Sequence, residues 1–357
     1  MKKMTSFVFA MLMAAGLSVS AGNVLAVSAE EAAQTVTVTG LDASGEAVEV
    51  EVPYDPQRVA VVDMATLDIL DNLGLGDRVV GSSSTALEYL QDYMNNDNIA
   101  NLGTVKEADF EAVMASEPDI IFMGGRMSES YKELSEIAPV VRLTTDTELG
   151  LVESVRKNAT TVASIFGLED EVEEKLAGYD SRIAALAAFA EGKNALIGMC
   201  TSGSFNILDN AGRCSLIGRE VGFENLGDSS EDSGEEAQSE GSTEGRGEGE
   251  RSGEGGSSGG RGQGGGGTAT HGNEASFELV VSMNPDYIFV MDRDAAIGTD
   301  GAQLAQEIME NELVMGTDAY KNGNIVYLEH PAVWYTAEGG ITALDYMLAD
   351  LEGALLQ

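Results

Sequence analysis

The sequence predicts an α/β protein with two similar lobes, each built on a mainly parallel sheet and joined by a long interdomain helix. Three observations indicate this fold. A unit at residues 109–126 returns 167 residues later at 276–293, with eight of the eighteen aligned positions identical. Short apolar runs alternate with helix-spaced segments in both halves of the chain. The stretch between the halves, residues 148–190, has helical spacing and no strand pattern.

The repeated unit begins as a short helix and ends as a buried strand. Asp109 or Ser276 can cap the first turn, and a Pro-Asp turn stops the helix. The apolar run that follows is short and uninterrupted, as is typical of a parallel strand covered on both faces. Each unit therefore places an arginine, Arg126 or Arg293, just past the carboxyl end of a core strand. Ligands bind at that rim in open α/β sheets.

The other elements of the first lobe follow from the same rules. A Thr/Val alternation predicts a hairpin, short apolar runs predict strands, and apolar residues at helical spacing predict helices. The predicted elements are a hairpin at 35–39 and 47–52, strands at 58–62, 79–81 and 140–143, and helices at 65–73 and 128–137.

Helix dominates the middle of the chain, and a second α/β series follows it. The segment 169–190 carries a helix-spaced apolar stripe, which fits either a helix that runs between domains or an ordinary core helix. The later predicted elements are strands at 195–199 and 325–328, loops at 201–213 and around Trp334 and Tyr335, and helices ending at Val221 and spanning 341–355. We therefore expect a first lobe at 27–168, an interdomain helix at 169–191 and a second lobe at 192–357.

Residues 1–26 have the pattern of a signal peptide. Lys2 and Lys3 form the positive region, an apolar run follows, and small residues mark a cleavage site. The run is shorter than the ~20 residues that a membrane-spanning helix needs. No cysteine lies near the cleavage site. We therefore expect export to the periplasm or cell envelope without a lipid anchor.

Residues 228–270 interrupt the second lobe with Ser, Glu and Gly and almost no apolar side chain. Such a segment cannot bury enough surface to offset the entropy of ordering, so it is predicted to be a disordered insertion. A glycine-rich phosphate loop is the alternative, but no Gly-Lys-Ser/Thr signature supports it.

The charge excludes several functions. The formal net charge is −40, from 60 acidic residues against 20 Lys and Arg, which argues against nucleic acid or an anionic membrane as a partner. Two histidines are too few for the usual ligand set of a free metal ion. Cys200 and Cys214 could form a disulfide or stay as buried thiols.

Enzymatic activity is not predicted. The sequence has no G-x-S-x-G elbow and no paired nucleophile and base, so an exported hydrolase is disfavoured. No intrinsic cofactor is expected.

Five strings together resemble the periplasmic iron–siderophore binding proteins with a helical backbone, and in particular their catecholate-siderophore branch. They are GGR at 124–126, NAGRC at 210–214, HGNEASFELV at 271–280, DYIFVMDRDAAIG at 286–298 and HPAVWYTAEGGI at 330–341. The resemblance implies a monomeric component of an ABC importer that captures a ferric siderophore in a cleft between the lobes and delivers it to a membrane permease. A binding protein for haem, cobalamin or another metal chelate is the alternative.

The resemblance also implies roles for single residues. Arg126, Arg213 and Arg293 match the family's cleft arginines, and guanidinium suits an anionic, aromatic ligand because it stays charged and can stack. His271 and Tyr335 match positions at which some relatives ligate iron directly. The neighbouring Trp334 could line the cleft instead of Tyr335, and His330 is expected to be structural.

The two glutamates of the repeat, Glu111 and Glu278, are candidates for docking on the permease. In the family, one exposed glutamate in each lobe contacts permease arginines. Glu107 is an alternative in the first lobe, and a solvated glutamate favoured by the helix dipole is the simpler explanation for either position.

Overall fold

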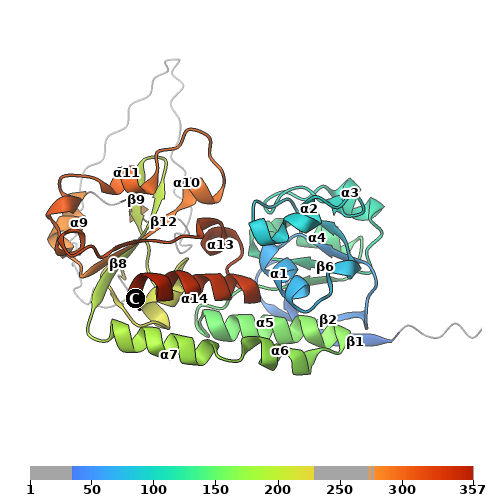
Figure 1. Cartoon of the computed structure of the whole chain (residues 1–357). Coiled ribbons are helices and arrows are strands. Elements are labelled where there is room, and N and C mark those ends of the chain that lie inside the picture. The colour runs from blue at the N-terminus through green and yellow to red at the C-terminus, as the bar shows by residue number, and fades with distance from the viewer. Residues whose placement is uncertain (1–33, 229–272, 275–276, 357) are drawn as a thin grey trace, which may run out of the picture. The chain divides into compact units, whose positions relative to one another are not determined.

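Two separate sheets, one in each half of the chain, organise the structure (Figure 1). The computed structural model describes residues 34–228, 273–274 and 277–356. The contacts group Gln34–Gln357 into one unit, and only that unit is described. The predicted signal peptide, the predicted insertion apart from Asp228, and His271 lie outside the described residues.

The first sheet is parallel throughout and has the strand order β5-β4-β3-β6-β7. A separate antiparallel hairpin, β1 and β2, comes before it in the chain. The strands are β1 (Thr35–Leu41), β2 (Ala47–Pro53), β3 (Val59–Val61), β4 (Val79–Ser82), β5 (Ala100–Asn101), β6 (Ile120–Met123) and β7 (Val140–Arg142).

The second sheet has the order β11-β9-β8-β12-β13, with β10 beside β8. Strands β8, β12, β13 and β10 are parallel to one another. At one edge, β9 is antiparallel to both of its neighbours, β8 and β11. The strands are β8 (Asn194–Thr201), β9 (Ser204–Ile207), β10 (Glu224–Asn225), β11 (Asn273–Glu274), β12 (Tyr287–Asp292) and β13 (Ile325–Tyr327).

Helices lie between most of the strands in both halves. The first half contains α1 (Met64–Asn72), α2 (Gln91–Met94), α3 (Phe110–Ala115), α4 (Tyr131–Ser135) and the 3-10 turns η1 (Gly76–Arg78), η2 (Glu88–Leu90) and η3 (Gly125–Ser130). The central helices are α5 (Leu151–Phe166), α6 (Glu169–Leu176) and α7 (Tyr179–Ala190). The second half contains α8 (Ser215–Arg219), α9 (Phe277–Met283), α10 (Arg293–Ala296), α11 (Ala305–Met309), η4 (Val314–Gly316), α12 (Asp318–Lys321), α13 (Pro331–Thr336) and α14 (Ile341–Leu355).

The repeated unit forms the same structure twice, as predicted. It is α3 followed by β6 in the first half and α9 followed by β12 in the second. The Asp109 carboxylate accepts a hydrogen bond from the Ala112 backbone N–H and so caps α3. Both strands are parallel to neighbours on each side, and Arg126 and Arg293 follow their carboxyl ends.

Three local predictions were wrong. The predicted loop at 201–213 contains β9, which pairs with β8 in a hairpin. The predicted aromatic loop around Tyr335 is helix α13, which Pro331 can start because the first turn of a helix needs no proline N–H. The helix predicted over 169–190 is two helices, because Gly178 has a φ of 97° and ends the α-helical geometry between them.

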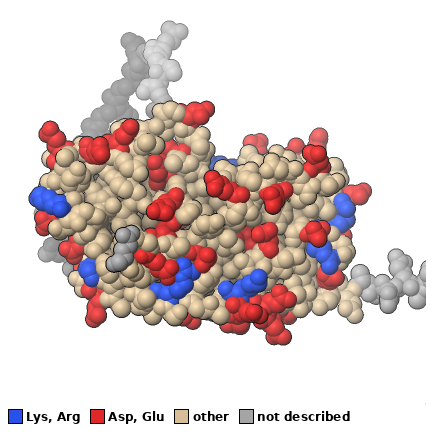
Figure 2. Space-filling model, in the orientation of Figure 1, with Lys and Arg blue, Asp and Glu red and all other residues tan. Residues whose placement is uncertain are grey.

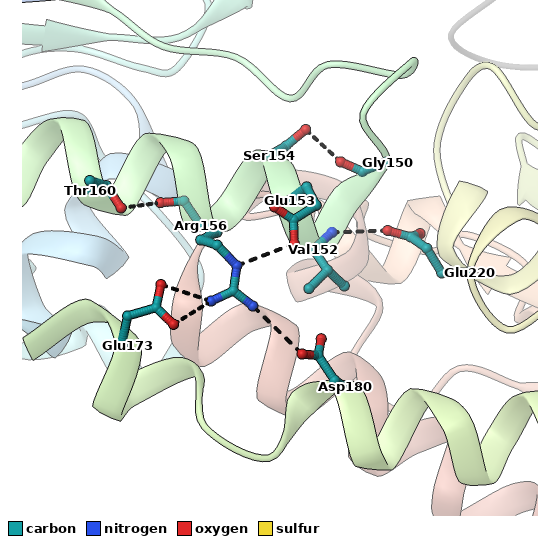
Figure 3. Close-up of polar contacts among 9 residues, drawn as sticks. All are labelled: Gly150, Val152, Glu153, Ser154, Arg156, Thr160, Glu173, Asp180 and Glu220. Carbon is teal, nitrogen blue, oxygen red and sulfur yellow. Dashed lines mark hydrogen bonds and ion pairs between the residues drawn. The ribbon is translucent and has the colours of Figure 1, made fainter.

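The two halves share one hydrophobic core. Its largest cluster includes buried side chains from both sheets and from α1, α5, α7 and α14. Figure 1 shows α5 and α6 side by side below the first sheet, and α7 below the second. The Arg156 guanidinium on α5 contacts Glu173 of α6 at 2.9 Å and Asp180 of α7 at 3.9 Å (Figure 3). The acids of these ion pairs are largely exposed, so the pairs contribute little beside the core.

Two carboxylates cap long helices that are distant from them in the sequence. Asp68 on α1 accepts hydrogen bonds from the Thr342 and Ala343 backbone N–H groups at the start of α14, at 2.8 and 2.9 Å. Glu220, after α8, accepts from the Val152 N–H at the start of α5, at 2.9 Å (Figure 3). Both helices have a glycine N-cap without a side-chain bond, and a Cβ at Gly340 would lie 2.4 Å from Asp68 Cγ. The missing local caps are therefore supplied across the fold.

Cys200 and Cys214 are both buried free thiols, which is the second of the two alternatives. Burial raises the pKa of Cys200 to about 12, so the thiol stays protonated. Over the described part of the chain, no helix combines the length and apolar character needed to cross a bilayer.

Candidate functional site

A pocket of about 680 Å³ lies where loops of both halves meet. The first half contributes residues at the start of α1, after β6 and after β7, and the second half contributes residues before α8 and from α13 onward. The charged and hydroxylated side chains among its lining residues are Asp63, Thr66, Lys106, Arg126, Thr144, Thr145, Arg213, Tyr335, Thr336 and Glu338. The pocket therefore takes in the carboxyl-terminal rim of the first sheet, as the strand rule predicts.

Three guanidinium groups surround the ring of Tyr335. The Cζ atoms of Arg126, Arg213 and Arg293 lie 5.2, 4.3 and 5.4 Å from the ring centroid. Arg293 Nε donates a hydrogen bond to Tyr335 Oη at 3.0 Å, and Arg126 Nη2 donates to the Tyr335 backbone carbonyl at 2.5 Å. Arginines that are far apart in the sequence thus converge on one phenol.

Burial and this concentration of positive charge together shift two pKa values. Burial, followed by the charge of Arg213, lowers the pKa of Arg126 below its ordinary value. Burial raises the pKa of the Tyr335 phenol, but the Arg293 hydrogen bond and the charges of the three arginines together outweigh it, so the net pKa is below its ordinary value. Guanidinium suits the anionic oxygens of a metal chelate, and phenolate suits the hard cation that such a chelate carries.

Arg213 has a hydrogen-bond donor that no other described residue satisfies. Its Nε is buried without a hydrogen-bond partner in the described part of the chain. A buried N–H without a partner is costly, and an anionic oxygen in the pocket would satisfy it.

Two acids balance part of the charge. Asp63 caps α1 by accepting from the Thr66 N–H at 2.9 Å, and burial raises its pKa. Burial raises the pKa of Glu338 to about 7, although the charge of Arg213 and the backbone N–H of Cys214 act to lower it. Both acids and Lys106 were absent from the site residues predicted from the sequence. Glu338 lies within the segment HPAVWYTAEGGI at 330–341, and Thr144 and Thr145 follow the carboxyl end of a strand, as Arg126 does.

The structure separates the remaining predicted site residues. Arg293 reaches Tyr335 but does not line the pocket. Trp334 is fully buried, and its indole N–H donates to Asp350 at 2.9 Å, so the geometry favours Tyr335 as the ring that faces the pocket. His330 Nδ1 lies 2.6 Å from Asp350 Oδ1, in agreement with a structural role. A ligand contact of Trp334 stays a prediction, as does that of His271.

No ready-made metal site is present among the described residues. Within 34–228, 273–274 and 277–356, no group of three or more His, Cys, Asp or Glu side chains is placed to hold a metal ion.

The family model of the periplasmic binding proteins matches residues 59–240 and 263–332. The chain belongs to this family. Its members bind solutes, so the expectation of a binding protein and not an enzyme is confirmed. Among curated relatives, this periplasmic binding protein is 32% identical to the petrobactin-binding protein YclQ of Bacillus subtilis over 85% of this chain and 84% of YclQ. It is 25% identical to the ferric-anguibactin-binding protein FatB of Vibrio anguillarum, over 83% of this chain and 81% of FatB.

Solved structures agree with the relationship. The crystal structure of YclQ from Bacillus subtilis matches with a TM-score of 0.74 at 31% identity, covering 91% of this periplasmic binding protein and 99% of YclQ. The catecholate-siderophore binding protein VctP of Vibrio cholerae matches with a TM-score of 0.71 at 28% identity, covering 89% and 100%. The predicted two-lobe α/β class is thereby confirmed.

The raised pKa of Glu338 predicts that the protein takes up protons when it binds an anion. Its pKa of about 7 leaves the carboxyl partly ionised at neutral pH, and a nearby negative ligand would raise that pKa further. Isothermal titration at pH 7 in buffers of different ionisation enthalpy should show net proton uptake, so affinity should increase as pH falls from about 8 to about 6.5. Glu338→Gln should abolish most of the uptake. Equal uptake by the two proteins would contradict this role of Glu338.

Proposed function

We propose that this protein is the substrate-binding component of an ABC importer and that its pocket captures an anionic ferric siderophore of the catecholate type. The observation that carries the proposal is the convergence of three guanidinium groups on Tyr335 within 5.4 Å of the ring centroid. Three relatives support the ligand class: one is named for petrobactin, one for ferric anguibactin and one for a catecholate siderophore. The predicted signal peptide agrees with work outside the cytoplasm.

The chemistry of the pocket fits a ferric catecholate. Such a chelate presents negatively charged oxygens around the metal and flat aromatic rings outside it. Guanidinium donates several hydrogen bonds to the oxygens and can stack on rings. On most of the visible surface acids outnumber basic side chains (Figure 2). The arginine cluster therefore stands out as an anion site on a strongly acidic protein.

Tyr335 could also bind the iron itself when the chelator leaves coordination sites open. The arginines lower the net pKa of its phenol, which favours the phenolate that ferric iron prefers. His271 is the second proposed ligand, carried over from the sequence. Its place relative to Tyr335 lies outside the described residues.

Fluorescence titration tests the proposal. Trp334, the one tryptophan of the sequence, is next to Tyr335, so transfer of excitation energy to a coloured ligand should quench it. Ferric bis- and tris-catecholates should quench at low ligand concentration, whereas haem and cobalamin should not. Tyr335→Phe should weaken a tetradentate chelate more than a hexadentate one. Tight binding of haem or cobalamin alone would refute the proposal, and equal losses for both chelates would refute direct ligation.

We further propose that Glu111 and Glu278 dock on the permease. Both are exposed in the first turn of their helices, α3 and α9, which are the two copies of the repeated unit. Their carboxylates are therefore free to meet cationic side chains of a partner. Glu107 is also exposed and stays the alternative in the first half.

Charge reversal separates docking from ligand capture. Glu111→Lys with Glu278→Lys should leave ferric-chelate affinity unchanged and reduce chelate-stimulated ATP hydrolysis by the reconstituted transporter at least tenfold. Glu129→Lys, an exposed acid of the same half, is the matched control and should have little effect. Full stimulation by the double variant would exclude these glutamates from docking.

A further inference from the structure

A second cavity, of about 310 Å³, lies between the β1–β2 hairpin and the loop after β7. It shares four lining residues with the larger pocket, namely Leu143, Thr144, Thr145 and Asn158. Arg142, the last residue of β7, lines the second cavity but not the larger pocket. Its Nη2 lies 4.0 Å from the position that a Cβ at Gly125 would take. Gly125 lines the larger pocket, so the Arg142 guanidinium lies at the boundary of the two cavities.

Arg142 is a buried cation without a carboxylate partner. Only 8% of the residue is exposed, and no carboxylate oxygen of the described residues lies within 4.0 Å of its nitrogens. One nitrogen, Nη1, donates to the backbone carbonyl of Asp42 in the hairpin turn. Nε is buried with no hydrogen-bond partner among the described residues. A buried charge is costly unless it is paired, so this arrangement is suited to an anion that comes from outside the chain.

The other side chains of the cavity complement an anion. Lys157 adds a second positive charge from the exposed face of α5. Thr39, Thr144, Thr145 and Thr147 supply hydroxyl groups, whereas the Thr161 hydroxyl already donates to the Lys157 backbone carbonyl at 2.9 Å. One acid is present, Asp146, and its Oδ1 already accepts from the backbone N–H groups of Glu148 and Leu149 at 2.9 and 3.4 Å. Two cations against one engaged acid leave the cavity net positive, on a chain with a formal charge of −40.

We propose that Arg142 forms a carboxylate subsite that extends the ligand pocket beneath the β1–β2 hairpin. A carboxylate matches the fork of a guanidinium and is small enough for the cavity. It could be a pendant arm of the chelate whose metal centre occupies the larger pocket, a source that rests on the proposed function. It could also be a free carboxylate from solution. Both sources place the same group on the same residue.

A matched pair of chelates tests the subsite in the full-length protein. One is a ferric bis-catecholate whose linker carries a carboxylate, and the other carries a primary carboxamide at that position. The wild type should bind the carboxylate form at least about tenfold more tightly, as expected for a charge-assisted hydrogen bond. Arg142→Gln should bind both chelates with the wild-type affinity for the carboxamide form. Lys157→Gln, at an exposed position, should reduce the preference less, and salt should diminish that effect.

Two controls separate the subsite from the larger pocket. Arg78→Gln removes an arginine of the same half that pairs with Asp55 at 3.1 Å and lines neither cavity, so it should keep the preference. Arg126→Gln should weaken both chelates equally. If neither chelate binds the wild type, the proposed function fails, and sodium acetate then tests the subsite alone.

Acetate also identifies the source of the carboxylate. Acetate binding to the ligand-free protein that Arg142→Gln abolishes would support the subsite and assign it to a free carboxylate. A preference for the carboxylate chelate without acetate binding would assign it to the pendant arm. Arg142→Gln could instead lower the unfolding temperature and weaken both chelates alike. That result would show that Arg142 only holds the hairpin turn, and it would overturn the proposal. The proposal would also be overturned if Arg142→Gln kept the preference for the carboxylate chelate and acetate binding was absent or unaffected.

Discussion

Arg213→Gln is expected to weaken binding of an anionic ferric chelate by about ten- to a hundredfold, which corresponds to ~1.5–3 kcal/mol for hydrogen bonds to a charged group. Arg213 lies closest of the three arginines to the Tyr335 ring, at 4.3 Å. Its Nε is buried without a hydrogen-bond partner in the described chain, so this nitrogen has no internal hydrogen bond to lose. The substitution should therefore change affinity far more than stability. Isothermal titration with a ferric tris-catecholate measures the first, and thermal unfolding measures the second.

A neutral substitution elsewhere controls for net charge. Lys132→Gln removes the same charge from an exposed position on α4 and should change affinity by less than about twofold, because salt screens distant surface charges. If the two variants lose equal affinity, the effect would come from overall charge and not from the pocket.

Asp68→Ala is expected to destabilise the protein by about 2–4 kcal/mol at pH 5, because buried donors would lose their acceptor. The Asp68 carboxylate accepts from the N–H groups of Thr342 and Ala343 and from the Tyr89 hydroxyl, the last at 2.6 Å. Without it, the first turn of α14 has no side-chain cap, since its N-cap residue is Gly340. Urea unfolding followed by circular dichroism measures the loss.

The cost of this substitution should depend on pH in a stated direction. Burial raises the pKa of Asp68 to about 6, against the hydrogen bonds that lower it. In the unfolded chain the group titrates near its ordinary value of ~3.9, so the folded state binds more protons between these values. Its contribution to stability is fully present below pH ~3.9 and is lost as pH rises from there through about 6. The stability difference between wild type and Asp68→Ala should therefore narrow from pH 5 to pH 7.

Asp71→Ala is the matched control for this prediction. Asp71 lies on the same helix, is exposed, and accepts one hydrogen bond, from the Tyr93 hydroxyl at 2.8 Å. Its removal should cost about 1 kcal/mol or less. An Asp68→Ala protein no less stable than Asp71→Ala would show that the cross-fold cap contributes little.

Local patterns in the sequence predicted the parts of the fold that local physics decides. The repeated helix and strand before Arg126 and Arg293 were predictable because a Pro-Asp turn and an apolar run act over only a few residues. The terminal helix, α14, occupies the predicted range 341–355. The rim rule then placed Arg126 at the pocket without knowledge of the sheet order.

Features that depend on distant contacts could not be predicted this way. Asp68 and Thr342 are 274 residues apart, and no periodicity links a carboxylate on one helix to the start of another. The side chains of Trp334 and Tyr335 are neighbours in α13, yet one is fully buried on Asp350 and the other meets the arginines. Only the packing of α13 decides which ring faces the pocket. Arg142 was missed because its chemistry depends on the hairpin turn that covers it.

We propose that the pocket at Tyr335 holds the iron of an anionic chelate. Crystals of the wild-type protein grown with a ferric bis-catecholate would test it directly through an anomalous difference map at the iron absorption edge. We expect a single strong peak inside the 680 Å³ pocket, with catecholate oxygens toward Arg126 and Arg213. A strong iron peak elsewhere, with this pocket empty, would show that the iron site lies outside the pocket and would contradict this proposal.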